Sequence, residues 1–363
     1  MQPVKPHFWM FLFFQFFEYT ALAQEKNWFI GAKSQVGFII PHSEDLKPIS
    51  DTHPLGLNIE SGLLIKSKRA WANCNCFSKV GLSFNYFNYQ NPRELGNSYN
   101  LVLFGEPYLG FKSRLYMTLR GGMGVTFLDQ VYDVTDNPRN TFYSSPISFL
   151  LVANIGVNYR LKEDLHLQLA ANYNHISNGG MRQPNKGMNF PTLSLGVEKH
   201  FGNTKFPEHE KERNFLAQPW KRYLYLGGSR RTVSADSLNE ESGHINIGVE
   251  GGIMRAVSNI NAFSGGVELY YNGAQGETSR RVTGEAEPLL FSLMFGHALV
   301  FGKFSFTQQM GYYAYKPYEF NDNNFFQRYT IFYQLGKRLS TGFSLRAHGH
   351  VADFMDVRIG MRW

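Results

Sequence analysis

Apolar and polar residues alternate with a period of two along most of this chain. The segment 115–127 shows the pattern clearly, and the segments 99–112 and 149–160 repeat it. Successive side chains of a β-strand point to opposite faces, so each segment is predicted to be a strand with one apolar and one polar face. In 115–127 the apolar face carries Leu115, Met117, Leu119, Met123, Val125 and Phe127, and the polar face carries Tyr116, Thr118, Arg120 and Thr126.

Sixteen such strands are expected, in two groups of eight separated by a polar, charged stretch at 203–218. The first group lies near 28–40, 54–66, 79–90, 98–112, 115–128, 146–160, 165–177 and 189–201. The second group lies near 222–233, 243–256, 262–273, 288–300, 303–315, 326–336, 342–352 and 355–363. The prediction is an all-β protein with two tandem eight-stranded antiparallel β-barrels, at 24–202 and 219–363. One barrel of about sixteen strands fits the same count.

The length of the strands and the distribution of charge favour a membrane barrel over a soluble β-sandwich. A sandwich also alternates apolar and polar positions, but regularly repeated segments of roughly 10–15 residues are typical of barrels that cross a membrane. Glu106 and Arg120 fall on polar faces and are expected to pair inside the barrel. The last strand ends on Trp363, which resembles the assembly signal of outer-membrane β-barrel proteins. The fold expected is therefore an outer-membrane β-barrel.

The N-terminal segment 1–23 is predicted to be a signal peptide. Lys5 supplies positive charge, an apolar run follows at 8–17, and Ala21-Leu22-Ala23 gives a small-x-small cleavage site. The alternative is an ordinary buried segment. Elsewhere no run of about 18 apolar residues occurs, so no transmembrane helix is expected. These features predict an exported protein of the outer membrane of a Gram-negative bacterium.

Charge and cysteine content narrow the choice of partners. The net charge of +7 is compatible with an anionic partner such as a phosphorylated glycolipid, and export argues against nucleic acid. The two cysteines, Cys74 and Cys76, are too few for a metal site of their own. A disulfide across one residue is strained and uncommon, so half-buried or surface thiols are expected, and a strained redox pair is the alternative. His348 and His350 alternate with apolar residues and are expected to face a polar interior. No metal or cofactor is expected.

The candidate chemistry lies at the end of the segment 165–177. His175 and Ser177 share the parity of the apolar residues in that strand, and side chains two residues apart lie about 6–7 Å apart on one face. Long loops at 41–52, 129–145 and 178–188 contrast with short turns elsewhere. Because outer-membrane barrels have short periplasmic turns and long external loops, this end of the strand is expected at the outer leaflet.

Neighbouring residues supply the other groups that ester hydrolysis by a serine requires. Asn189 in the next strand shares the outward parity, so it is expected beside His175 as the residue that orients the imidazole. Asn178, Asn185 and the backbone around Gly179 are expected to donate hydrogen bonds to an oxyanion.

At these residues the chain resembles the PagL-type lipid A 3-O-deacylases, a family of acyloxyacyl hydrolases. The matching positions, in order and at the spacing of the family, are His175, Ser177, Asn178, Gly180, Asn185 and Gly187. The resemblance covers roughly 24–202 and implies an eight-stranded outer-membrane barrel with Ser177 as nucleophile and His175 as general base. It also implies hydrolysis of the 3-O-linked acyl chain of lipid A, so the partners would be lipid A, or lipopolysaccharide, and outer-membrane lipid.

One position departs from the family, because Asn189 stands where the family has glutamate. Asparagine can orient an imidazole, as in Cys-His-Asn sites, but it cannot stabilise the imidazolium by charge. Activity below the family norm is expected. The alternatives are a non-catalytic barrel (pore, adhesin or scaffold) with a degenerate site, and a phospholipase. Arg182 and Lys186 either hold lipid A phosphates or are solvated loop charges, and 219–363 lacks the motif and has no assigned role.

Overall fold

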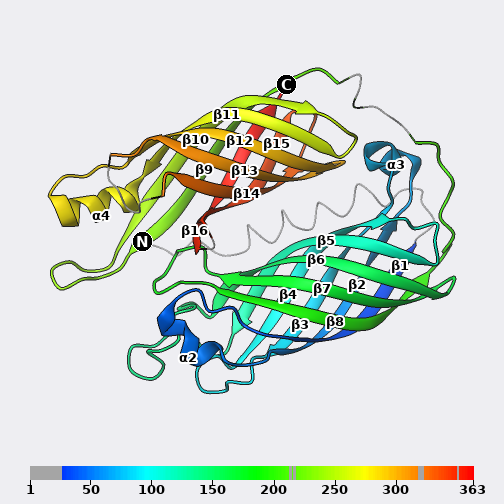
Figure 1. Ribbon diagram of the computed structural model, residues 1–363, viewed down its shortest axis with the longest axis horizontal. Coiled ribbons are helices and arrows are strands. Elements are labelled where there is room, and N and C mark those ends of the chain that lie inside the picture. The colour runs from blue at the N-terminus through cyan, green and yellow to red at the C-terminus, as the bar shows by residue number, and fades with distance from the viewer. Residues whose placement is uncertain (1–26, 212–214, 216–217, 318–322, 350) are drawn as a thin grey trace, which may run out of the picture.

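The computed structural model describes residues 27–211, 215, 218–317, 323–349 and 351–363. They form two closed eight-stranded barrels, which lie side by side and touch through hydrogen bonds (Figure 1). The prediction of two barrels is confirmed, and the alternative of one sixteen-stranded barrel is wrong. The predicted signal peptide at 1–23, and His350, lie outside the described residues.

Consecutive strands of each barrel pair antiparallel, and the last strand of each pairs with the first. The first barrel consists of β1 (Trp28–Gly37), β2 (Leu55–Ile65), β3 (Ser78–Asn88), β4 (Asn97–Leu109), β5 (Leu115–Leu128), β6 (Ile147–Lys162), β7 (Leu165–Ser177) and β8 (Met188–Phe201). The second consists of β9 (Lys221–Val233), β10 (Ser242–Ala256), β11 (Asn261–Asn272), β12 (Leu289–Phe301), β13 (Phe304–Tyr315), β14 (Phe325–Gln334), β15 (Leu339–His348) and β16 (Val351–Arg362).

Short helices lie in the connections at both ends of the barrels. The 3₁₀-helix η1 (Glu44–Leu46) and α2 (Lys47–Ser50) join β1 to β2, and α4 (Gly273–Thr283) joins β11 to β12. These helices lie at the left in Figure 1, whereas α3 (Lys68–Cys74), between β2 and β3, lies at the right. No helix in the described segments is long and apolar enough to cross a bilayer.

Paired charges fill the lumen of the first barrel. Glu106 and Arg120 pair as predicted, with Arg120 Nε donating to Glu106 Oε2 at 2.5 Å. Arg120 also pairs with Glu60 at 2.6 Å, and Lys79 lies 3.1 Å from Glu106. All four side chains are almost completely buried. Buried charges are tolerated when they are paired and hydrogen-bonded, so the lumen holds together as an ion-pair network.

The second barrel fills its lumen in the same way with different residues. Arg358 Nη1 lies 2.7 Å from Glu250, and its Nη2 lies 3.0 Å from Glu268. Arg328 also pairs with Glu268. His348 was expected to face the interior, and its Nε2 lies 3.0 Å from the hydroxyl oxygen of the buried Tyr313.

The prediction of two free thiols is wrong, because Cys74 and Cys76 form a disulfide at the end of α3. Asn75 between them has a φ of 52°. Asparagine visits this left-handed conformation more easily than most residues, so the chain turns tightly enough there for the two sulfurs to meet. The periodicity of the sequence carries no sign of this turn.

The charged stretch after the first barrel begins by packing against it. Phe206 stacks on Phe77 with 5.3 Å between ring centroids, and Trp71 Nε1 donates to the carbonyl of Glu210 at 2.7 Å. The connection therefore leaves from the α3 end of the barrel.

Candidate active site

The candidate site forms where the end of β7 meets the start of β8. In the antiparallel register His175 lies opposite Asn189 of β8 and opposite Leu151 of β6. Ser177, two residues further along β7, lies opposite Phe149. The alternation of the strand therefore places His175 and Ser177 on the outer face, and cross-strand pairing brings Asn189 beside the imidazole.

The hydrogen bond to Asn189 fixes the tautomer of His175. Its Nδ1 lies 2.6 Å from Asn189 Oδ1. An amide oxygen only accepts, so Nδ1 must carry the proton, and Nε2 keeps a lone pair. Nε2 is buried and has no hydrogen-bond partner among the described residues. This is the arrangement of a histidine prepared to take a proton through Nε2.

Two donors converge on the hydroxyl of Ser177. The backbone N–H of Gly179 and the side-chain Nδ2 of Asn185 each donate to Ser177 Oγ at 3.0 Å. Within the described residues, no hydrogen bond joins Ser177 to His175. The serine oxygen is therefore held by its loop, with its own hydrogen free to be donated.

The loop after β7 is held in shape by its asparagines. Asn178 N–H donates to Asn185 Oδ1 at 3.0 Å, and Asn178 Oδ1 accepts from Gly180 N–H at 2.9 Å. Gly179 and Gly180 have φ values of 70° and 80°, a left-handed conformation that glycine adopts at little cost. The structure thus brings together Asn178, Gly179 and Asn185, the predicted oxyanion donors, around the hydroxyl of Ser177.

Gly187 allows the loop to return past the histidine. Its φ is 75°, and a Cβ added there would lie 2.9 Å from His175 Cε1. Any side chain at this position would therefore push against the imidazole as well as strain the backbone.

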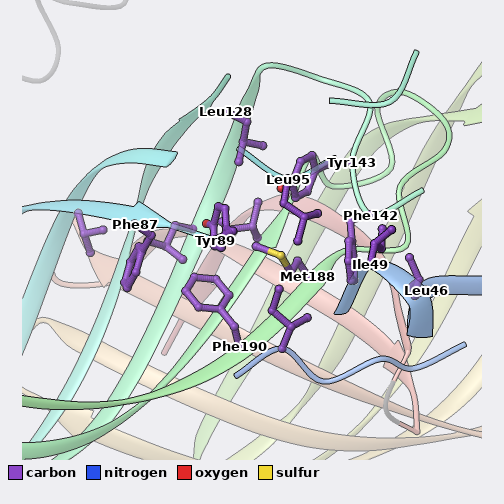
Figure 2. Close-up of a cluster of buried hydrophobic side chains, with 14 residues drawn as sticks. Leu46, Ile49, Phe87, Tyr89, Leu95, Leu128, Phe142, Tyr143, Met188 and Phe190 are labelled. Carbon is purple, nitrogen blue, oxygen red and sulfur yellow. The ribbon is translucent and has the colours of Figure 1, made fainter. Parts of the chain in front are cut away.

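A buried hydrophobic cluster anchors the site from the inside of the barrel. Ile176, between His175 and Ser177, and Met188, next to Asn189, are fully buried in it. Figure 2 shows Met188 among the clustered side chains, which also include Phe142 and Tyr143 of the 129–145 loop. Because inward and outward residues alternate, fixing Ile176 and Met188 also fixes the outward side chains beside them.

His175 and Ser177 share the outward parity of β7, but their side chains are buried. The side chains of the same face behind them are exposed, with Leu169 at 45% and Tyr173 at 47%. His175 is only 8% exposed, Ser177 4% and Asn189 8%. The loop 178–188 covers them, and residues of the second barrel pack against that loop.

The two basic loop residues have different surroundings. Lys186 Nζ lies 2.5 Å from Asp45 Oδ2, and Thr141 Oγ1 donates to the same carboxylate at 2.9 Å. The hydrogen bond from Lys186 holds the pKa of Asp45 well below its usual range. Arg182 is exposed. Lys186 is thus already paired with η1 of the β1–β2 connection, whereas Arg182 points to solvent.

No group of three or more His, Cys, Asp or Glu side chains in the described part of the chain is arranged to hold a metal ion.

Fold and site together define a class of protein, an outer-membrane β-barrel with a candidate hydrolytic site on its outer surface. The family model of the lipid A 3-O-deacylases (PagL) matches residues 57–198. The model of the C-terminal domain of acyloxyacyl hydrolases matches residues 220–363. The first barrel belongs to the lipid A 3-O-deacylase (PagL) family and the second to the C-terminal domain of acyloxyacyl hydrolases, so this is a protein of the Gram-negative outer membrane from families of hydrolases.

Three solved structures are similar to part of this chain. The outer-membrane enzyme PagL is 13% identical, with 46% of this chain and 97% of that chain covered and a TM-score of 0.35. Neisserial surface protein A is 13% identical, with coverages of 48% and 97% and a TM-score of 0.35. The attachment invasion locus protein Ail of Yersinia pestis is 12% identical, with coverages of 49% and 100% and a TM-score of 0.29. Among curated proteins, none matches the sequence.

Sequence reasoning missed two kinds of contact at the site. The first joins two long loops, 178–188 and 129–145. Lys186 N–H donates to Thr141 O at 3.1 Å, and Gly187 N–H donates to Phe142 O at 2.8 Å. The second contact is that of Thr232 in β9 with the loop after Ser177. Neither carries a local sequence signal, because both join segments that are far apart in the chain.

Proposed function

We propose that this protein is a serine esterase that hydrolyses the 3-O-linked acyl chain of lipid A, using the site on the barrel at 24–202. The observation that carries the proposal is the pairing of His175 Nδ1 with Asn189 Oδ1, which leaves Nε2 free to act on the neighbouring Ser177. The family match supports the substrate, since the matched model describes lipid A 3-O-deacylases.

The reaction begins with attack of Ser177 Oγ on the ester carbonyl, while His175 Nε2 takes the hydroxyl proton. Catalytic hydrogen bonds often form only with substrate in place, so the lack of a Ser177–His175 bond here is compatible with this step. The tetrahedral intermediate collapses when His175 returns the proton to the departing sugar hydroxyl. Water then hydrolyses the acyl-serine with His175 as base, which releases the fatty acid and restores the serine.

The amide donors stabilise the negative charge that forms. Gly179 N–H and Asn185 Nδ2 already converge on Ser177 Oγ, so they lie next to the position of the carbonyl oxygen during attack. Asn178 holds Gly180 and so shapes the same loop. One donor of this kind typically contributes about 10²- to 10³-fold in kcat. Arg182, exposed on the loop, is a candidate contact for a lipid A phosphate.

The filled lumen of the first barrel argues against the pore alternative for that barrel. The cavity that lies among the lumen residues of the first barrel has a volume of only about 20 Å³, because Arg120 and its ion-pair partners occupy the interior. A phospholipase would use the same histidine and serine, so it is separated from a lipid A deacylase by assay.

The test is mass spectrometry of lipid A from cells that express the wild type or Ser177→Ala. The wild type is expected to remove one 3-O-linked acyl chain, and Ser177→Ala to leave lipid A intact. Ser194→Ala, which changes a buried serine of β8, is the matched control and should behave as wild type. Identical acylation in all strains would refute the proposal, and fatty acid release from phospholipid alone would make the enzyme a phospholipase.

A further inference from the structure

A strand of the second barrel is hydrogen-bonded to the loop that follows Ser177. Thr232 of β9 donates its backbone N–H to the carbonyl of Gly180 at 3.2 Å. Its hydroxyl Oγ1 donates to the carbonyl of Met181 at 2.8 Å. One residue of the second barrel therefore holds two consecutive carbonyls of the loop.

The beginning of β16 packs against the two glycines of the same loop. A Cβ added at Gly179 would lie 3.3 Å from the Cβ of Met355, and one added at Gly180 would lie 3.8 Å from the carbonyl oxygen of Asp353. Arg231, next to Thr232, pairs with Asp353 at 2.7 Å and so ties β9 to β16. The loop therefore rests on a braced surface.

The braced part of the loop is also the part that holds the serine. Gly179 N–H donates to Ser177 Oγ, and Gly180 N–H donates to Asn178 Oδ1. A shift of the peptide units between Asn178 and Met181 would carry these N–H groups away from their acceptors. Hydrogen-bond donors contribute to catalysis only when they are held within a fraction of an ångström of their working geometry.

We propose that Thr232 is a positioning residue for Ser177, acting through residues 178–181, so that the second barrel forms part of the working site. This inference rests on the proposed function and deepens it, because it gives 219–363 a role. Thr232 touches no reacting atom. It keeps the backbone of the loop in the conformation that aims Gly179 N–H at the serine.

The test compares three full-length variants of β9 in the outer membrane. Thr232→Val keeps the shape of the side chain and removes the hydroxyl, and loss of one such hydrogen bond is expected to lower kcat about 3- to 10-fold with KM within about 2-fold. Thr232→Ser should restore most of the rate. Ser229→Ala is the control, since it removes a β9 hydroxyl that has no hydrogen-bond partner among the described residues. An unchanged kcat in Thr232→Val would overturn the inference.

A second readout separates this inference from the proposed function. Arg182 is exposed in the loop, so trypsin cleavage after Arg182 reports how well the loop is held. Thr232→Val should be cleaved faster than wild type and Ser229→Ala should not. If Ser177→Ala is as active as wild type, the proposed function fails, and the cleavage rate still tests the bracing. Unchanged cleavage, or faster cleavage with unchanged kcat, contradicts the positioning role.

A different observation, at the opposite end of the second barrel, points to a ligand site. A cavity of about 570 Å³ opens where the linker enters β9, between the turns of the second barrel and α3 of the first. Every charged side chain that lines the cavity is basic. These basic residues are Lys221, Lys303, Lys337, Arg338 and Arg362.

The positive charge of this cavity is largely uncompensated. None of the five basic side chains forms an ion pair with a described residue, whereas the lumen cations of both barrels are paired. Among the described residues, the side chain of Arg362 donates only to uncharged oxygens, at Tyr225 and Ser305. The α-carboxylate of Trp363, which also lines the cavity, offsets one of the five charges.

Exposed aromatic residues on the lining mark the depth of the cavity in the membrane. Trp220, Phe304 and Trp363 are large, exposed and part of its wall. Such aromatic girdles lie at the membrane–water interface of barrel proteins, at the level of lipid headgroups. We infer that the cavity binds the phosphate headgroup of an anionic phospholipid in the leaflet on the linker side.

The test measures lipid retention by the full-length protein, purified from mixed micelles that contain phosphatidylglycerol and phosphatidylcholine. Wild type should retain phosphatidylglycerol in preference, and the double variant Lys303→Glu with Lys337→Glu should lose the preference. Arg114→Glu with Lys162→Glu changes the same charge at exposed positions of the first barrel that do not line the cavity, and this variant should keep the preference. The inference is overturned if wild type retains the two lipids equally. It is also overturned if the cavity variant and its control do not differ in their preference for phosphatidylglycerol. Displacement of phosphatidylglycerol by millimolar inorganic phosphate would make free phosphate the ligand instead.

Discussion

Replacing Asn189 by aspartate places a negative charge beside His175 with almost no change of shape. The amide oxygen already lies 2.6 Å from His175 Nδ1, so the isosteric carboxylate oxygen would occupy the same position. During attack by Ser177 the imidazole gains a proton, and a charged acceptor then stabilises it more than a neutral one. We therefore expect Asn189→Asp to raise kcat.

The size of the effect follows from the type of hydrogen bond. A neutral hydrogen bond contributes about 0.5–1.5 kcal/mol and one to a charged group about 1.5–3 kcal/mol. The difference, about 1–2 kcal/mol, corresponds to a roughly 5- to 30-fold higher kcat. Asn189→Glu supplies the same charge on a longer side chain, so a smaller rise is expected because the oxygen must be repositioned.

The assay is the rate of acyl release from lipid A by purified wild type, Asn189→Asp, Asn189→Glu and Asn189→Ala. Asn189→Ala removes the orienting acceptor and should be slower than wild type. Asn203→Asp, which adds the same charge at the other end of the barrel, should have no effect. If both acidic variants are folded and are no faster than wild type, the reasoning that charge limits this site is wrong.

Three further changes test how the site is held. Gly187→Ala should lower kcat at least 10-fold and destabilise the loop by about 1 kcal/mol or more, because its φ is 75° and its Cβ would press on His175; kinetics and trypsin sensitivity check this. Asn185→Ala should lower kcat about 10²-fold with little change in KM, because it removes a donor to Ser177 Oγ. Ile176→Ala should lower the free energy of unfolding in urea by about 2–5 kcal/mol, because the side chain is fully buried.

The sequence predicts the two barrels well because membrane and lumen select opposite kinds of side chain. Lipid accepts Leu115 and Met117, and the filled lumen accepts Arg120 when Glu106 and Glu60 can pair with it. The alternation of apolar and polar residues in each strand therefore indicates which face contacts lipid and which faces the lumen. The disulfide at Cys74 escaped prediction because it depends on one left-handed residue in a turn, where no periodicity applies.

The sequence predicts only those parts of the site that depend on strand pairing and on the spacing of the motif. Parity alone places Asn189 beside His175, because the two lie on adjacent strands with the same outward face. The burial of Ser177 could not be read in this way. It depends on a loop folded back by left-handed glycines and on Thr232, which lies more than 50 residues away along the chain. Such contacts are set by tertiary packing.

The even number of strands in each barrel has a consequence for how the two halves meet. Eight strands return the chain to the end where it entered, so the linker joins the barrels without crossing the membrane. A separate second barrel would have to find the loop after Ser177 by diffusing through the bilayer. Tethered by the linker, it stays at a high local concentration, so a few weak contacts such as those of Thr232 are enough to keep the loop braced.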